Sequence, residues 1–179
     1  MRIFYIIISS LILFATFPLN WSKSKKYSIK TIGFYNVENL FDTFDDSLTF
    51  DEDYTLKGKN HYSNENYSEK INNTAKVISE IGSDIMGSGP SIIGLAEIEN
   101  YKVLIDLVNS KKLKNYAYQI IHKDSPDRRG IDVALLYREV DFLPIDTEFI
   151  DVRLWNEKGE RIYTRDILYV NGILDNDEL

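Results

Sequence analysis

The spacing of hydrophobic and polar positions along the chain alternates between the periods of strands and helices. Runs typical of β-strands occupy residues 29–36, 92–96, 116–121, 131–137, 142–152 and 162–170. A helical pattern covers residues 65–82, where Ile71, Ala75 and Ile78 fall on one face, and a shorter amphipathic one covers residues 101–108. Strands and helices in this order predict a mixed α/β domain whose helices cover sheet faces.

The run from Ile92 to Ala96 is short, apolar and rich in β-branched residues, which predicts a strand buried on both faces. Glu97 follows it directly. A carboxylate at the end of a buried strand is costly unless it meets a cation or hydrogen-bond donors. Glu97 is therefore either a metal ligand or a capped structural charge, and the pattern alone leaves both open.

Two polar segments separate these elements. Residues 42–60 are acidic and include Asp51-Glu52-Asp53, but the spacing of an EF-hand is absent, so a solvated loop is favoured over a calcium loop. Residues 122–130 place Arg128 and Arg129 before Gly130. Such arginines can hold a phosphate or a carboxylate. The pattern by itself favours a solvated, internally ion-paired turn.

Composition narrows the chemistry. A length of 179 residues suits one domain with a sizeable core. The net charge of −7 argues against a protein held on nucleic acid by a basic surface, although it permits an enzyme that neutralises phosphate with a divalent cation. Cysteine is absent, which excludes disulfides and thiolate sites. The only histidines are His61 and His122, so histidine-based mechanisms are restricted.

The N-terminus has the pattern of a targeting segment. Arg2 precedes an apolar stretch over residues 3–19, and a cluster of lysines follows. This pattern predicts a signal peptide or an uncleaved N-terminal anchor over residues 1–25. The rest of the chain is then expected to be exported, as a periplasmic, cell-surface or secreted domain. Contact with a membrane is expected only through this segment, if it stays attached.

Three runs in order, GFYNVENLFD, IIGLAEIEN and DSPDRRGIDVALLYR, followed by TRDILYV, resemble the endonuclease/exonuclease/phosphatase family. The resemblance covers roughly residues 29–174. It implies a four-layer α/β sandwich like that of deoxyribonuclease I, with the active site at one edge of two packed sheets. Residues 27–179 would then be an incomplete domain, the N-terminal half of that sandwich.

The resemblance also implies hydrolysis of phosphodiesters or phosphomonoesters with Mg²⁺, or with Mn²⁺ or Ca²⁺ in its place. Asn36 matches the family asparagine that orients a phosphate oxygen and the neighbouring acidic group, and Glu97 matches the metal-binding glutamate. Arg129 lies near the position of a contact with the substrate phosphate. For Glu38 and Glu99 the resemblance implies contacts within a turn or behind the metal ligand. The implied substrate is a phosphate ester, either nucleic acid, phospholipid or a small phosphoester, and no stable protein partner is expected.

The chain departs from the family in its later motifs. The family histidine near the substrate phosphate, the aspartate-x-asparagine pair and the final aspartate-histidine pair have no counterpart here. A general base that activates water is thus missing, and we expect an inactive N-terminal fragment of an exported phosphoesterase. The alternative is a non-catalytic exported binding module that reuses the fold.

Overall fold

The computed structural model describes residues 27–175. The expected signal peptide or anchor over residues 1–25 lies outside the described part. Within it, none of the helices combines the length and the apolar character that crossing a bilayer requires.

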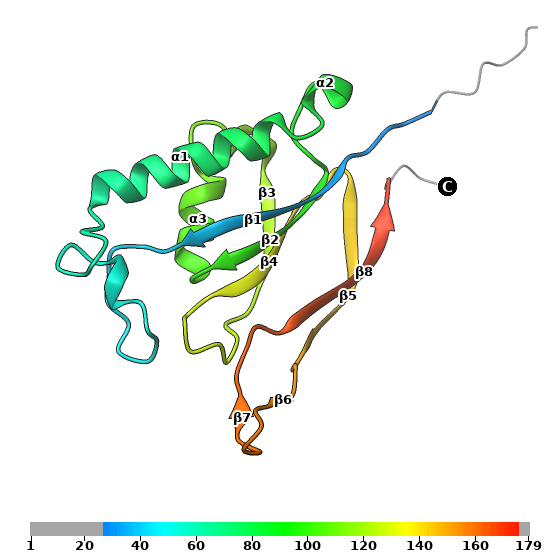
Figure 1. Cartoon of the computed structure of the whole chain (residues 1–179). Coiled ribbons are helices and arrows are strands. Elements are labelled where there is room, and N and C mark those ends of the chain that lie inside the picture. Colours follow the sequence, from blue (N-terminus) through cyan, green and yellow to red (C-terminus); the bar gives the residue numbers. More distant parts are fainter. Residues whose placement is uncertain (1–26, 176–179) are drawn as a thin grey trace, which may run out of the picture.

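The centre of the fold is a four-stranded sheet with the strand order β1-β2-β4-β3. Its strands are β1 (Ile32–Leu40), β2 (Ile92–Ile98), β3 (Tyr118–His122) and β4 (Asp132–Arg138). β1 and β2 run parallel, whereas β4 is antiparallel to both of its neighbours. The polar ends of β1 and β2 therefore lie side by side at one edge of the sheet, as Figure 1 shows.

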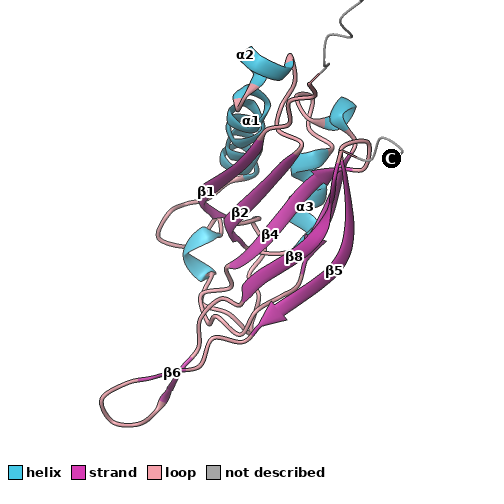
Figure 2. Cartoon of the chain, turned by 90° about the vertical axis from the view of Figure 1, so that its right-hand side faces the viewer, coloured by secondary structure: helices cyan, strands magenta, loops and turns pink. Residues whose placement is uncertain are grey.

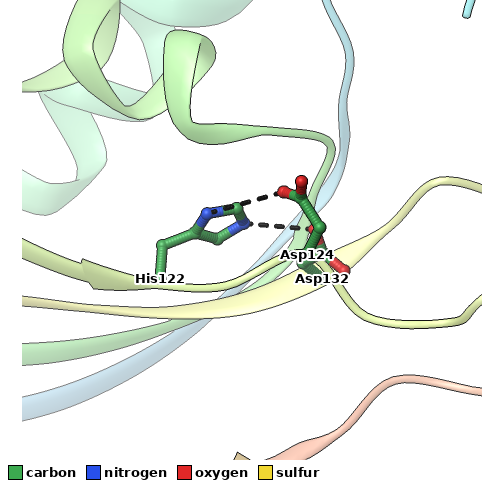
Figure 3. A group of neighbouring side chains, drawn as sticks. All are labelled: His122, Asp124 and Asp132. Carbon is green, nitrogen blue, oxygen red and sulfur yellow. Dashed lines mark hydrogen bonds and ion pairs between the residues drawn. The ribbon is translucent and has the colours of Figure 1, made fainter.

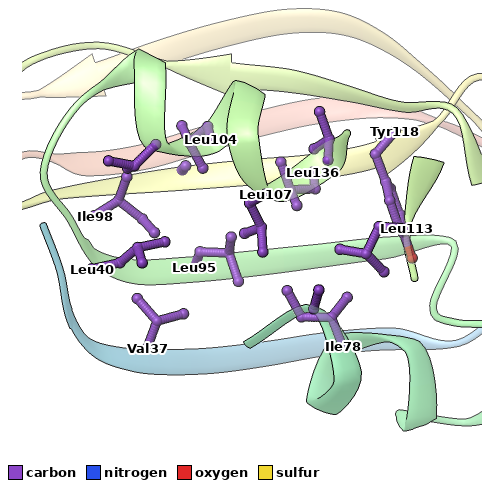
Figure 4. Packing of buried hydrophobic residues seen from close by; sticks show 14 of the residues in the cluster. Val37, Leu40, Ile78, Leu95, Ile98, Leu104, Leu107, Leu113, Tyr118 and Leu136 are labelled. Atoms are coloured by element: carbon purple, nitrogen blue, oxygen red, sulfur yellow. The ribbon is translucent and has the colours of Figure 1, made fainter. Parts of the chain in front are cut away.

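One face of this sheet is covered by α1 (Asn64–Glu80) and α3 (Tyr101–Val108) (Figure 1). Ser63 caps α1 through a reciprocal capping box, and Asn100 caps α3 by accepting a hydrogen bond from the backbone N–H of Val103 at 3.0 Å. The apolar faces of the two helices meet the sheet in the main core, part of which is seen in Figure 4. Its fully buried members include Leu40, Ile78, Ile93, Leu95, Ile98, Leu104, Leu107 and Leu136.

The opposite face of the sheet is approached by an antiparallel ribbon of β5 (Phe142–Ile150) and β8 (Ile167–Leu174) (Figures 1 and 2). A cavity of about 490 Å³ separates the ribbon from the sheet and is lined by apolar residues of β1, β2, β4 and β8. Between the ribbon strands, the chain forms a hairpin of β6 (Leu154–Trp155) and β7 (Arg161–Ile162), which projects away from both sheets. The connections add α2 (Ser83–Met86), η1 (Glu52–Tyr54) and η2 (Lys114–Tyr116).

The mixed α/β class expected from the sequence is confirmed, while the four-layer sandwich stays a prediction. Three expectations differ from the structure. β1 continues to Leu40, beyond the expected end of this strand at residue 36, and the strand expected over residues 162–170 is divided into the short β7 and a later β8. The 42–60 loop is not simply solvated, since Asp42 and Asp51 are buried at 6% and 1% exposure. Their burial follows from the loop folding back on the end of β2.

Candidate functional site

Asn36 of β1 and Glu97 of β2 meet at the shared polar edge of the sheet. The parallel register pairs Asn36 with Ala96, so the next residue of β2 is Glu97. The Nδ2 group of Asn36 donates a hydrogen bond to Oε1 of Glu97 at 3.1 Å. Two residues that are 61 positions apart, and that the sequence picked out separately, thus form one contact.

The backbone is irregular at both of these strand ends. The β1–β2 register shifts between Asn36 and Leu40, and the β2–β4 register shifts between Ala96 and Ile98. Glu97, at the second irregularity, has a φ of 69°, a left-handed conformation that is costly for a residue with a Cβ. Bulges of this kind redirect a side chain from its regular orientation in the sheet, and unfavourable backbone conformations are concentrated at functional sites.

The orientation of the Asn36 amide is fixed by its second contact. Its Oδ1 accepts a hydrogen bond from the backbone N–H of Glu38 at 2.8 Å, so its amide nitrogen is the atom that faces Glu97. This contact is made by the backbone of Glu38 within β1, and a turn contact of its side chain stays a prediction. Among the described residues, Oε2 of Glu97 has no hydrogen-bond partner. Because the Glu97 side chain is only 19% exposed, this oxygen is a partly enclosed acceptor at the sheet edge.

The nearest cation is Arg165, to which the sequence analysis assigned no role. Its Nη1 lies 3.7 Å from Oε1 of Glu97. Arg165 and Asn36 also line the same cavity of about 520 Å³, together with Thr164 and Asp166. The only sequence signal was the run TRDILYV, which was used to place a strand.

Arg129 lies on the β3–β4 loop and is paired within that loop. Its Nε and Nη2 donate to the two carboxylate oxygens of Asp127 at 3.0 and 2.7 Å. The hydrogen bond to Asp127 raises the pKa of Arg129, and Glu97 adds a smaller electrostatic contribution in the same direction. The internally paired turn favoured by the pattern is therefore what the structure shows. A phosphate contact of Arg129 stays a prediction.

Glu99, two residues after Glu97, enters a different environment. It is 9% exposed, and its Oε2 accepts a hydrogen bond from the backbone N–H of Asp42 at 2.5 Å. Burial raises the pKa of Glu99 to about 8, with further upward contributions from the nearby Asp42 and Asp51. A carboxyl group in this environment carries a proton at neutral pH and does not repel the nearby aspartates. Its hydrogen bond from Asp42 holds the acidic loop against the end of β2.

Neither histidine hydrogen-bonds or ion-pairs with Asn36 or Glu97 in the described part of the chain. His122, the last residue of β3, lies between Asp124 and Asp132. His61 is in the loop before α1 and has a φ of 47°. That neither histidine serves this site stays a prediction.

The comparison with protein families agrees with these motifs. Residues 31–179 match the sequence profile of the Endonuclease/Exonuclease/phosphatase family, and this match covers most of the chain. No curated protein and no solved structure matches the chain. Members of this family act on phosphate esters such as nucleic acids and generally depend on divalent metal ions. The chain belongs to the endonuclease/exonuclease/phosphatase family.

Proposed function

We propose that this chain carries the first half of the site of an exported phosphoesterase, in which Glu97 holds a divalent cation, Mg²⁺ foremost. The observation that supports this is the meeting of three groups at one sheet edge. Asn36 fixes one oxygen of Glu97 at 3.1 Å, and Arg165 adds a positive charge 3.7 Å from the same oxygen. Export rests on the pattern of residues 1–25, and cell fractionation of the expressed chain tests it.

The residues at this edge suit a hard cation. Mg²⁺ binds oxygen ligands, takes one or two carboxylates and keeps several waters. Glu97 supplies one carboxylate whose Oε2 is open among the described residues, and a side chain only partly exposed to solvent. A cation bound there would polarise a phosphoryl oxygen and offset charge on the leaving oxygen.

The same edge suits the phosphate of a substrate. Arg165 and Asn36 line one cavity, so an amide and a guanidinium are available to the same anion. Arginine presents planar, paired donors that match phosphate oxygens, and it keeps its charge at every relevant pH. We assign Arg165 the role of positioning the phosphate next to Glu97. Arg129 is the weaker candidate for this contact because Asp127 occupies two of its donors.

The general base is the part of the site that we propose these residues lack. A base must reach the attacking water by a hydrogen bond, directly or through one water. In the described part, His122 pairs with Asp132, and His61 lies in the loop before α1. We therefore expect the 179-residue chain to bind the cation and turn over phosphate esters at a rate near that of the uncatalysed reaction.

Titration of the chain with Mn²⁺, followed by electron paramagnetic resonance, tests the metal site. Glu97→Gln keeps the hydrogen bond from Asn36 but removes the ligand charge, so we expect it to abolish the tight site. Glu69→Gln, an exposed change on α1 with the same loss of charge, should leave binding unchanged. Equal Mn²⁺ binding by the Glu97→Gln chain would exclude Glu97 as the ligand.

Hydrolysis of bis(p-nitrophenyl) phosphate by the same proteins separates the enzyme from the binding module. Rapid Mg²⁺-dependent turnover that is lost in Glu97→Gln would overturn the expected inactivity and show that the chain is complete as a catalyst. Tight Mn²⁺ binding without turnover is the result we expect. The alternative, a non-catalytic module, gains support if a chain extended beyond residue 179 in its natural gene binds Mn²⁺ but stays inactive.

A further inference from the structure

A second group of metal-ligating side chains lies where β3 and β4 are joined. His122 is the last residue of β3, Asp132 is the first residue of β4, and Asp124 is in the loop between them. One ligand atom from each of the three lies within 4.8 Å of the others. Figure 3 shows both aspartates on one side of the imidazole ring, with a dashed line from a different ring nitrogen to each of them.

The buried carboxylate fixes the proton on the ring. Nε2 of His122 is 3.1 Å from Oδ2 of Asp132, and Oδ1 of Asp132 accepts a hydrogen bond from the backbone N–H of Ser125 at 2.8 Å. An ionised carboxylate only accepts hydrogen bonds, so the proton of the ring is on Nε2. The His122 and Asp132 side chains are 2% and 4% exposed, which holds both in place. The lone pair of a neutral ring is then on Nδ1.

Nδ1 faces Asp124 without a hydrogen bond. The distance from Nδ1 to Oδ1 of Asp124 is 3.9 Å, beyond the range of a hydrogen bond. The Asp124 side chain is 84% exposed. Two ligand atoms of one tetrahedral zinc ion lie roughly 3.4 Å apart, given bonds of about 2.1 Å. A shift of about 0.5 Å in the exposed Asp124 would therefore close the pair around a cation.

The surroundings attract cations. Asp124 and Asp132 line a cavity of about 560 Å³, and its lining residues include six aspartates, besides the protonated Glu99, while Arg128 is the one arginine or lysine among them. Such a concentration of one sign of charge raises the local concentration of the opposite ion. Imidazole nitrogen selects borderline cations such as Zn²⁺ over Mg²⁺, which prefers oxygen.

We propose that His122 and Asp124 bind a Zn²⁺-like divalent cation through Nδ1 and a carboxylate oxygen, with water completing the coordination and Asp132 orienting the ring. This site is distinct from Glu97 in residues and in preferred metal. Metal-ligating histidines commonly donate their other N–H to a carboxylate in this way. The bound cation would tie the β3–β4 loop, which carries Arg129, to the end of β3.

The test uses the full chain with Glu97→Gln, so that the other site is removed and the result does not depend on the proposed function. The sequence has two histidines, so a ¹H–¹⁵N spectrum of the imidazoles contains two spin systems. Without metal, we expect His122 to show the Nε2–H tautomer. Addition of Zn²⁺ should shift the Nδ1 resonance of His122 and leave His61 unchanged.

Asp124→Asn is the diagnostic variant, because its side chain is exposed and the change leaves the fold intact. We expect it to weaken Zn²⁺ binding by about tenfold or more. Asp45→Asn is the matched control, since Asp45 is an exposed residue lining the same cavity and loses the same charge. A loss of less than about threefold is expected for it, because exposed charges are screened. The proposal is overturned if His122 is doubly protonated and unmoved by Zn²⁺, or if both variants weaken binding equally.

Discussion

We expect the Glu99→Gln variant to be more stable than the parent protein at neutral pH, and this advantage in the free energy of unfolding should grow as the pH rises. Glu99 is 9% exposed and its carboxyl faces Asp42 and Asp51, so the ionised form is disfavoured in the folded protein. Glutamine resembles the protonated acid. It keeps an oxygen for the backbone N–H of Asp42, and its amide can donate to Asp51 as the acid proton does.

The magnitude follows from the difference between the folded and unfolded pKa values. The pKa of Glu99 is about 8 in the folded protein, against an ordinary value of 4.5. Between these values the folded state binds a proton that the unfolded state has lost, so the free energy of unfolding falls as the pH rises, by roughly 1.4 kcal/mol per pH unit. The contribution is fully present below pH 4.5 and lost above pH 8. At pH 7 the loss is about 3 kcal/mol.

Urea unfolding of both proteins between pH 4.5 and pH 8.5 measures this difference directly. The variant and the parent should be similarly stable at the acid end, and the variant should gain about 3 kcal/mol over the parent by pH 7. Glu69→Gln, on the exposed side of α1, should follow the parent at every pH. A Glu99→Gln curve parallel to the parent curve would refute the buried, protonated carboxyl.

Three further changes test the core, a helix cap and the phosphate contact. Leu104→Ala should lower the free energy of unfolding in urea by about 3 kcal/mol because this side chain is fully buried. The neighbouring Ile105 is 38% exposed, so Ile105→Ala should lower it by less than about 1 kcal/mol. Similar losses for the two variants would contradict the packing of α3. Asn100→Ala should cost about 1 kcal/mol by removing the cap of α3, and an unchanged midpoint would show that the cap contributes nothing. Arg165→Gln should weaken the binding of inorganic phosphate to the Mn²⁺-loaded chain by about tenfold, as followed by ³¹P line broadening. Arg153 lies on the projecting segment before β6, and Arg153→Gln should leave phosphate binding unchanged.

The elements that the sequence located best are those whose signals are local. The helical pattern over residues 65–82 corresponds to α1 at Asn64–Glu80, and the pattern over residues 101–108 is α3 itself. In both cases a capping side chain, Ser63 or Asn100, fixes the start, and an apolar stripe fixes the buried face. Periodicity and caps act within a few residues, so they can be recognised without knowledge of the fold.

The features that were missed depend on contacts between distant segments. Arg165 meets Glu97 only because the chain returns from the β6–β7 hairpin to begin β8 beside the edge of the central sheet. Asp51 is buried because its loop folds against Glu99, and nothing in a run of acidic residues reveals that fold. The family resemblance named Asn36, which it expected to orient a neighbouring acidic group, and Glu97, yet it did not point to Arg165, the cation beside them.

The irregularity in β2 explains how Glu97 and Glu99, only two positions apart in sequence, enter different environments. In a regular strand, residues two apart lie on the same face, so Glu97 and Glu99 would share one environment. The register shift at Glu97 and its left-handed φ separate them. Glu97 turns to Asn36 and Arg165, while Glu99 turns into an acidic pocket in which the neutral acid is favoured. The left-handed backbone at Glu97 therefore lets one strand end place one carboxyl group at the sheet edge and bury a second, protonated one behind it.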